Sequence, residues 1–178
     1  MLKGLDFKIN PGDKVGVVGR TGAGKSTLAM ALTRIVEIEQ GHILIDGQDT
    51  KDIELASLRR QITIIPQESA LFEGTLKYNL DPEGNASEQD MLRMIKSANM
   101  TDLLERDPKG LEQKIESEGT NLSSGEKQLV CICRAALRRS KIVLLDEATA
   151  NIDTNTEKAV QALINSEFKD ATMLTIAH

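Results

Sequence analysis

Aromatic residues are scarce in this chain of 178 residues, which contains three phenylalanines, one tyrosine and no tryptophan. The hydrophobic core must therefore be built mainly from aliphatic side chains. Positive charge is not in excess either, because the formal net charge is −5. A nucleic-acid-binding domain usually presents a strongly basic face, so we expect no nucleic-acid partner. A local group of basic residues has the spacing of the solvated side of one helix, namely Arg134, Arg138, Arg139 and Lys141.

The sequence also lacks an apolar run of the about 18–20 residues that a membrane-spanning helix needs. Residues 1–11 alternate between polar and apolar side chains and do not form a signal peptide. The only two cysteines, Cys131 and Cys133, lie two positions apart in a helical pattern, so they point in different directions and a disulfide is disfavoured. A metal site would need more ligands. We interpret both as buried or half-buried thiols in a reducing compartment.

What the sequence does contain is an alternation of strand and helix patterns, which predicts a single α/β domain with a largely parallel sheet. We expect strands at residues 2–10, 14–18, 42–46, 62–65, 141–146 and 172–176, with residues 14–18 buried. We expect helices at residues 25–36, 123–139 and 155–168, and a mostly helical stretch at residues 75–106. The change from mixed strand and helix patterns to a mostly helical pattern predicts a helical subdomain of about residues 75–139, inserted into a core of residues 1–74 and 140–178.

Residues 19–27 read GRTGAGKST, which satisfies the phosphate-loop pattern G-x-x-x-x-G-K-[ST] between a predicted strand and a predicted helix. Glycines allow backbone N–H groups to point inward around phosphate oxygens. Lys25 would place its charge between the β- and γ-phosphates, and the Ser26 hydroxyl would bind Mg²⁺. We predict that the whole loop binds the nucleotide: Gly19, Arg20, Thr21, Gly22, Ala23, Gly24, Lys25, Ser26 and Thr27. The fold class is therefore a P-loop NTPase core, with an antiparallel β part on its N-terminal side.

Polar residues follow three other predicted strands. Asp146 stands at the carboxyl end of the strand KIVLLD, where open α/β sheets bind ligands, and it fits a partner of Mg²⁺. Glu147 points the other way and is able to act on water. Gln67 follows ITIIP and could reach a metal or a water with its amide, and His178 follows MLTIA. Taken alone, the acid pair could merely cap the next helix, and the Gln and His could be ordinary surface residues.

The stretch NLSSGEKQLV predicts a second helix start of unusual composition. Ser123 and Glu126 have the spacing of a capping box, in which two side chains satisfy backbone N–H groups reciprocally. Ser124 and Gly125 lie between them, and two serines and a glycine at a helix start can also hold a phosphate. One domain would thus contain two phosphate-binding segments, about a hundred residues apart.

Together and in this order, these motifs resemble those of ATP-binding cassette domains over essentially the whole chain. The segments GRTGAGKST, ITIIPQ with LFEGTLKYNLDP, and DEATANID are similar to the second cassette of the C subfamily, the multidrug-resistance-associated type. The resemblance implies a head-to-tail dimer with a second nucleotide-binding domain, in which each signature segment faces the ATP of the other chain. It also implies transmembrane domains as partners, at the cytoplasmic face of a membrane, while the chain itself is soluble.

The resemblance further implies a role for each motif residue. Ser123, Ser124 and Gly125 would contact the γ-phosphate held by the partner domain, and Asp153 would lie across the dimer interface. On the chain's own nucleotide, Glu147 would be the general base and Asp146 a partner of Mg²⁺. Gln67 would bind Mg²⁺ and couple to a membrane partner, and His178 would contact the γ-phosphate. The implied activity is hydrolysis of Mg·ATP that powers transport.

The chain departs from the family pattern in several places. The usual signature is LSGGQ, whereas Ser124 replaces a glycine and Glu126 a glutamine. An aromatic residue that would stack on adenine upstream of the first strand is absent, since nothing aromatic precedes Phe7. We expect a cassette truncated at both ends. Three alternatives are a regulatory nucleotide-binding module with slow hydrolysis, a cassette of translation or DNA repair, and an unrelated phosphate-loop kinase. The short segment between Gln67 and Ser123 leaves no room for the coiled coil of a repair-type cassette.

Overall fold

The computed structural model describes residues 4–20, 22–146 and 154–177. The chain divides into two compact units, of which the first comprises Met1–Ile64, Ser140–Glu147 and Asp170–His178, and the second Ile65–Arg139 and Ala148–Lys169. These boundaries differ from the predicted ones at residues 65–74 and 148–169, which group with the second unit. The division into an ATP-binding core and a helical subdomain remains a prediction about function.

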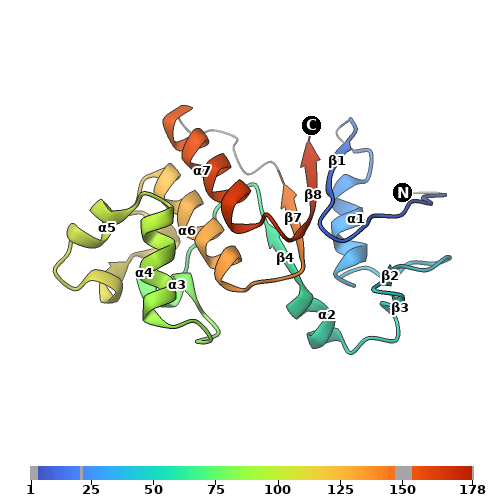
Figure 1. The fold of residues 1–178 in the computed structure, drawn as a ribbon, viewed down its shortest axis with the longest axis horizontal. Helices are drawn as coiled ribbons and strands as arrows, with labels where there is room; N and C mark the ends of the chain where they lie inside the picture. The colour runs from blue at the N-terminus through green and yellow to red at the C-terminus, as the bar shows by residue number, and fades with distance from the viewer. Residues whose placement is uncertain (1–3, 21, 147–153, 178) are drawn as a thin grey trace. The chain divides into compact units, whose positions relative to one another are not determined.

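A four-stranded sheet forms the centre of the first unit (Figure 1). Its order is β1 (Lys14–Val18), β8 (Thr172–Ala177), β7 (Ile142–Asp146) and β4 (Ile62–Ile65). The β1–β8 and β7–β8 pairs are parallel, so the chain must cross over between them. A separate antiparallel pair, β2 (Leu44–Ile45) with β3 (Gln48–Asp49), is the antiparallel part on the N-terminal side. The predicted α/β fold class is confirmed.

The core of the first unit lies around the buried side chains of Leu58, Ile62, Leu144 and Leu174. Two sequence predictions are wrong at its N-terminal side. Strand β1, one of the two outer strands of this order, is not buried, because its residues alternate between exposed and half-buried. Residues 4–10 of the predicted strand 2–10 belong to no strand, since alternation alone does not make a strand without a neighbour to pair with.

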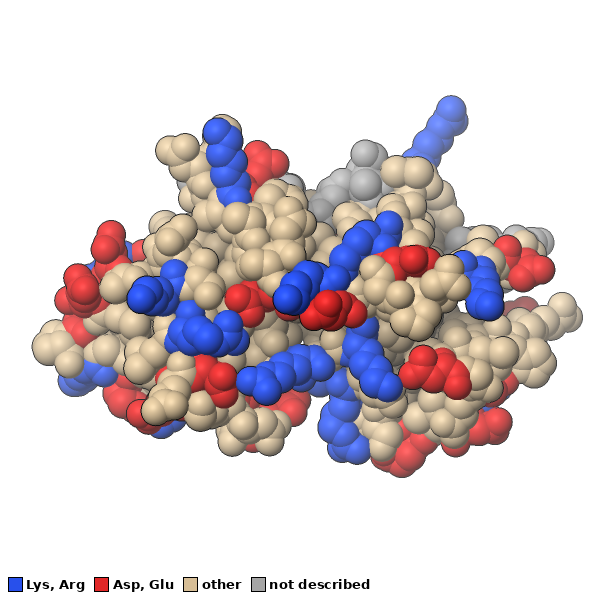
Figure 2. Space-filling view, in the orientation of Figure 1, with Lys and Arg blue, Asp and Glu red and all other residues tan. Residues whose placement is uncertain are grey.

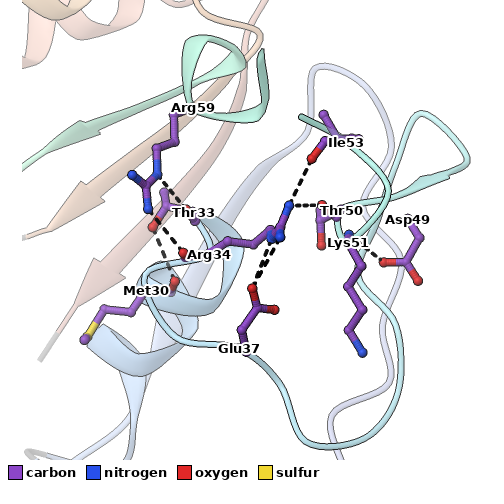
Figure 3. Close-up of polar contacts among 9 residues, drawn as sticks. All are labelled: Met30, Thr33, Arg34, Glu37, Asp49, Thr50, Lys51, Ile53 and Arg59. Atoms are coloured by element: carbon purple, nitrogen blue, oxygen red, sulfur yellow. Dashed lines mark hydrogen bonds and ion pairs between the residues drawn. The ribbon is translucent and has the colours of Figure 1, made fainter. Parts of the chain in front are cut away.

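Helix α1 (Lys25–Leu32) is four residues shorter than predicted, because the chain turns at Arg34, whose φ is 50°. The Arg34 guanidinium donates to the carbonyls of Thr50 (3.0 Å) and Ile53 (2.9 Å). Arg59, from helix α2 (Leu55–Gln61), donates to the carbonyls of Thr33 (3.1 Å) and Arg34 (3.2 Å). In Figure 3 the Arg59 side chain points toward the end of α1, whereas the Arg34 side chain points away from it toward Thr50 and Ile53. Arg59 thus binds carbonyls just beyond the end of α1, where a helix leaves carbonyls unsatisfied. Arg34 ties the same end of the helix to the loop that contains Thr50 and Ile53.

The second unit is mainly helical, with α3 (Leu76–Leu80), α4 (Glu88–Ser97), α5 (Thr101–Glu105), α6 (Ser124–Leu137) and α7 (Thr154–Glu167). A short antiparallel pair joins β5 (Gly74–Thr75) to β6 (Lys114–Ile115), and two 3₁₀ turns lie at Gly110–Glu112 and Ser117–Gly119. Its core is aliphatic as predicted: Phe168 is buried, but Phe72 and Tyr78 are exposed. Both cysteines are buried free thiols in α6, as predicted.

The local group of basic residues is paired with acids and carbonyls. Arg138 contacts Glu83 (3.4 Å), Arg139 contacts Asp90 (3.2 Å), and Arg134 donates to the carbonyls of Asn79 and Ala70. The face shown in Figure 2 carries both signs of charge interspersed. In the part of the chain that the structure describes, no helix is long and apolar enough to cross a membrane.

Candidate functional site

The phosphate loop connects β1 to α1 through backbone conformations that favour glycine. Gly22 has φ 82°, and Gly24, the residue that precedes α1, has φ 90°. At Gly19 an added Cβ would lie 3.3 Å from the Cβ of Ala23, because the loop folds back on itself there. Residues 22–27 line a hollow of about 190 Å³. Neither a side-chain cap nor an acidic first-turn residue is found at this helix start among the described residues, which suits an anion.

Lys25 lies in this hollow and is only 6% exposed. Its ammonium group donates to the backbone carbonyl of Gly19 and, at 3.3 Å, to that of Arg20. The loop's own carbonyls thus hold a positive charge at the start of a helix, where the helix dipole adds to it. Ser26 and Thr27 follow and are exposed. Backbone donors, one ammonium group and a hydroxyl are the set that a Mg²⁺-bound nucleotide phosphate requires, so these residues fit that group.

Asp146 lies at the same edge of the sheet as this loop. In the strand register, Asp146 is opposite Ile176 of β8, and Val18 of β1 is opposite Ala177. Because adjacent strands are about 4.8 Å apart, β1 and β7 end about 10 Å from one another, with the end of β8 between them. No group of three or more His, Cys, Asp or Glu side chains that could hold a metal occurs among the described residues. One carboxylate and one hydroxyl at this edge of the sheet suit Mg²⁺, which takes its other ligands from substrate phosphates and water.

The remaining predicted residues of this site lie in the second unit or outside the described residues. Gln67 is exposed, two residues beyond β4, and belongs to the second unit. Thr21, Glu147, Asp153 and His178 lie outside the described residues. Their roles remain predictions.

The signature segment forms the predicted capping box at the start of α6. The Ser123 hydroxyl accepts from the Glu126 N–H (3.2 Å), and a Glu126 carboxylate oxygen accepts from the Ser123 N–H (2.8 Å). Ser123 and Ser124 are exposed. Gly125 is buried, and an added Cβ there would lie 2.6 Å from Cγ2 of Thr156 in α7. The glycine is therefore required by the close approach of α7, a reason that the sequence did not reveal.

A second feature that sequence reasoning missed is Arg106, which forms an ion pair with Glu126. Burial alone would raise the pKa of the Glu126 carboxyl, but hydrogen bonds from Ser123 and Arg106 outweigh it and hold that pKa below its usual range. The two residues are 20 positions apart. No local pattern links them, so no signal in the sequence could have paired them.

Comparison with known proteins decides the family. A family model described as ABC transporter matches residues 2–150. The chain belongs to the ABC transporter family. The predicted resemblance is confirmed, and so is its C-subfamily character, because similar curated proteins carry that name.

The chain is 49% identical over its whole length to a probable multidrug resistance-associated protein of Drosophila melanogaster. It is 47% identical over its whole length to ATP-binding cassette sub-family C member 3 of Rattus norvegicus. It spans only 13% and 12% of these two proteins. Among solved structures, a bacterial Atm1-family ABC exporter with ATP bound matches 98% of the chain, with a TM-score of 0.88 and 39% identity, over 31% of that exporter chain.

Proposed function

We propose that this ABC domain binds and hydrolyses Mg·ATP and thereby powers transport across a membrane. The observation that carries the proposal is the hollow of residues 22–27, in which Lys25 is held by loop carbonyls at the start of α1. The similar exporter has ATP bound, and the loop offers the donors that a triphosphate needs.

In this proposal each residue of the first unit has one task. The loop N–H groups and Lys25 bind the β- and γ-phosphates, while Ser26 and Asp146 hold Mg²⁺. The metal supplies neutralisation of the charge that develops on the phosphates. Glu147 orients a water and accepts its proton as the water oxygen bonds to the γ-phosphorus and the bond to the β-phosphate oxygen breaks. Gln67 and His178 complete the contacts to Mg²⁺ and the γ-phosphate.

The second half of the proposal concerns partners. Ser123, Ser124 and Gly125 present a helix start to the γ-phosphate of a second nucleotide-binding domain, and Asp153 lies across the same interface. Two such domains close head to tail around ATP and reopen after hydrolysis. Transmembrane domains, coupled through the segment around Gln67, convert this cycle into transport, with the domain at the cytoplasmic face.

One observation favours an alternative, a regulatory module with slow hydrolysis. The Ser123 hydroxyl donates its single proton to Glu126 (2.9 Å), so a phosphate in trans must compete for it. A module that senses ATP needs binding without rapid turnover, and a weakened signature would serve that purpose.

Sedimentation of the Glu147→Gln chain with and without Mg·ATP tests the proposal, alongside turnover measurements on the unmodified chain. Blocked hydrolysis traps an ATP-bound dimer, so we expect a shift from monomer to dimer that the added Lys25→Ala change prevents. Turnover of Glu147→Gln at the unmodified rate would remove Glu147 from the mechanism. An unmodified chain that dimerises with Mg·ATP without turning it over would instead establish the regulatory module.

A further inference from the structure

The start of α6 carries an acidic residue where a phosphate is proposed to arrive, and both oxygens of that residue are engaged. One carboxylate oxygen of Glu126 accepts from the Ser123 N–H (2.8 Å) and the Ser123 hydroxyl (2.9 Å). The other accepts from the guanidinium of Arg106. Glu126 is thus bound on one side by the helix cap and on the other by a cation.

The charge of Glu126 has opposite consequences for the helix and for its proposed ligand. A carboxylate in the first turn interacts favourably with the helix dipole and caps the helix. The same negative charge repels a phosphate that approaches the same N–H groups. Arg106 cancels this charge locally, so the helix keeps its cap while its start stays able to accept an anion.

The position of Arg106 fits this task. It is the first residue after α5, and its N–H bonds to the Asp102 carbonyl at 3.0 Å, so its backbone is fixed by that helix end. Its side chain is 52% exposed, whereas that of Glu126 is 21% exposed. A guanidinium carries five N–H donors in a planar fork, and such a fork recognises carboxylates and phosphates alike.

We propose that Arg106 is a positioning residue for the signature segment, which neutralises Glu126 and so allows this acidic signature to accept the partner's phosphate. The inference rests on the proposed function, in which α6 faces the ATP of a second domain. Arg106 is then the specific compensation for the glutamate that replaces the usual glutamine.

The test is a double-mutant cycle in the Glu147→Gln chain, with the Mg·ATP concentration that gives half-maximal dimer measured by sedimentation. Arg106→Ala should raise that concentration by roughly 5- to 10-fold, because each dimer has two sites and one unpaired charge at a helix start weakens anion binding a few-fold. The combination of Arg106→Ala with Glu126→Gln should return it to within about two-fold of the parent. Arg106→Lys should be intermediate, since it keeps the charge but not the fork.

A matched control is Arg93→Ala, which breaks an ion pair away from the signature segment. Arg93 lies 3.4 Å from Glu167, and the two side chains are 52% and 16% exposed, close to the values for Arg106 and Glu126. It should leave the Mg·ATP concentration for half-maximal dimer unchanged. Every variant should also bind ATP as a monomer with the affinity of the parent chain. A double variant as weak as Arg106→Ala would overturn the inference and make Arg106 merely structural. An unaltered midpoint in Arg106→Ala would overturn it as well. A parent chain that binds ATP but never dimerises would overturn both this inference and the proposed trans role.

Discussion

Two helix starts in this molecule are proposed to bind phosphate, and they are built in opposite ways. Helix α1 begins after a left-handed glycine, with no side-chain cap and no acidic residue in its first turn among the residues described. Helix α6 begins with a complete capping box, an acidic residue and a cation that pairs with it. The first start is adapted to receive an anion from outside. At the second start, side chains of the same protein already bind backbone N–H groups of the helix.

The difference shows how each helix is stabilised. A capping box stabilises its helix by about 1 kcal/mol, and α6 has this contribution without any ligand. Helix α1 lacks it and is instead held at its other end by Arg34 and Arg59 (Figure 3). We therefore expect ligand binding to matter more for α1 than for α6.

The largest expected effect is at α1. Lys25→Ala should abolish measurable ATP binding, a loss of roughly 100-fold or more, because it removes a charge-assisted hydrogen bond to phosphate. Isothermal titration calorimetry with Mg·ATP measures it. Lys51→Ala is the control, since Lys51 is an exposed lysine that lies outside the phosphate loop, two residues beyond β3. Unchanged ATP affinity in Lys25→Ala would defeat the phosphate-loop assignment and erase the contrast between the two helix starts.

The α1 start was predictable from sequence because its chemistry is contiguous. Nine successive residues specify the glycine conformations, the lysine and the hydroxyl, and the preceding strand and following helix are equally local. The parallel sheet was predictable for a related reason, since strand and helix patterns alternate along the chain. The end of α1 was not, because it depends on Arg59, which is 25 residues beyond Arg34 in the chain and binds its carbonyl.

A smaller effect, on stability, is expected at the start of α6. It distinguishes the packing role of Gly125 from its proposed role in phosphate binding. Gly125→Ala should destabilise the fold by about 1–3 kcal/mol, because the new Cβ would lie 2.6 Å from Cγ2 and 3.0 Å from Oγ1 of Thr156. Urea unfolding measures the change. Thr156→Ala removes both atoms and should rescue a large part of the loss.

Gly16→Ala serves as the control for the Gly125 prediction, since an added Cβ at Gly16 meets nothing within 4 Å. It should change stability by less than about 0.5 kcal/mol. If Gly125→Ala proved as stable as the unmodified chain, α7 would not require this glycine, and the backbone donor role would remain its only explanation.

The contacts that Gly125 and Glu126 make with distant parts of the chain could not be predicted from the sequence. The capping box was predictable because Ser123 and Glu126 are three residues apart, which is a local rule. Thr156 and Arg106 reach the same helix start from α7 and from the end of α5. Such contacts are set by how helices pack and leave no local pattern in the sequence. The sequence thus predicted that α6 starts at this point but not what surrounds the start.

The smallest expected effect is the pH dependence of the α6 start. Burial opposes ionisation of Glu126, yet hydrogen bonds from Ser123 and Arg106 outweigh it and lower the pKa of this carboxyl below its ordinary value. A folded-state pKa below the unfolded one of about 4.3 means that ionised Glu126 stabilises the fold above that pH. The contribution is lost as the pH falls through the lower folded value.

The stability advantage of the unmodified chain over Glu126→Gln should therefore shrink on acidification from pH 7 to pH 3. The change in this advantage should not exceed roughly 1 kcal/mol, because the ion pair of Glu126 with Arg106 is partly exposed to solvent and screened. Urea unfolding at a series of pH values measures the difference. In the Arg106→Ala background the pH dependence should be weaker, since one of the groups that lower the pKa is gone. An advantage that grows on acidification would mean that Glu126 is not stabilised as a carboxylate, and the satisfied start of α6 would lose its electrostatic basis.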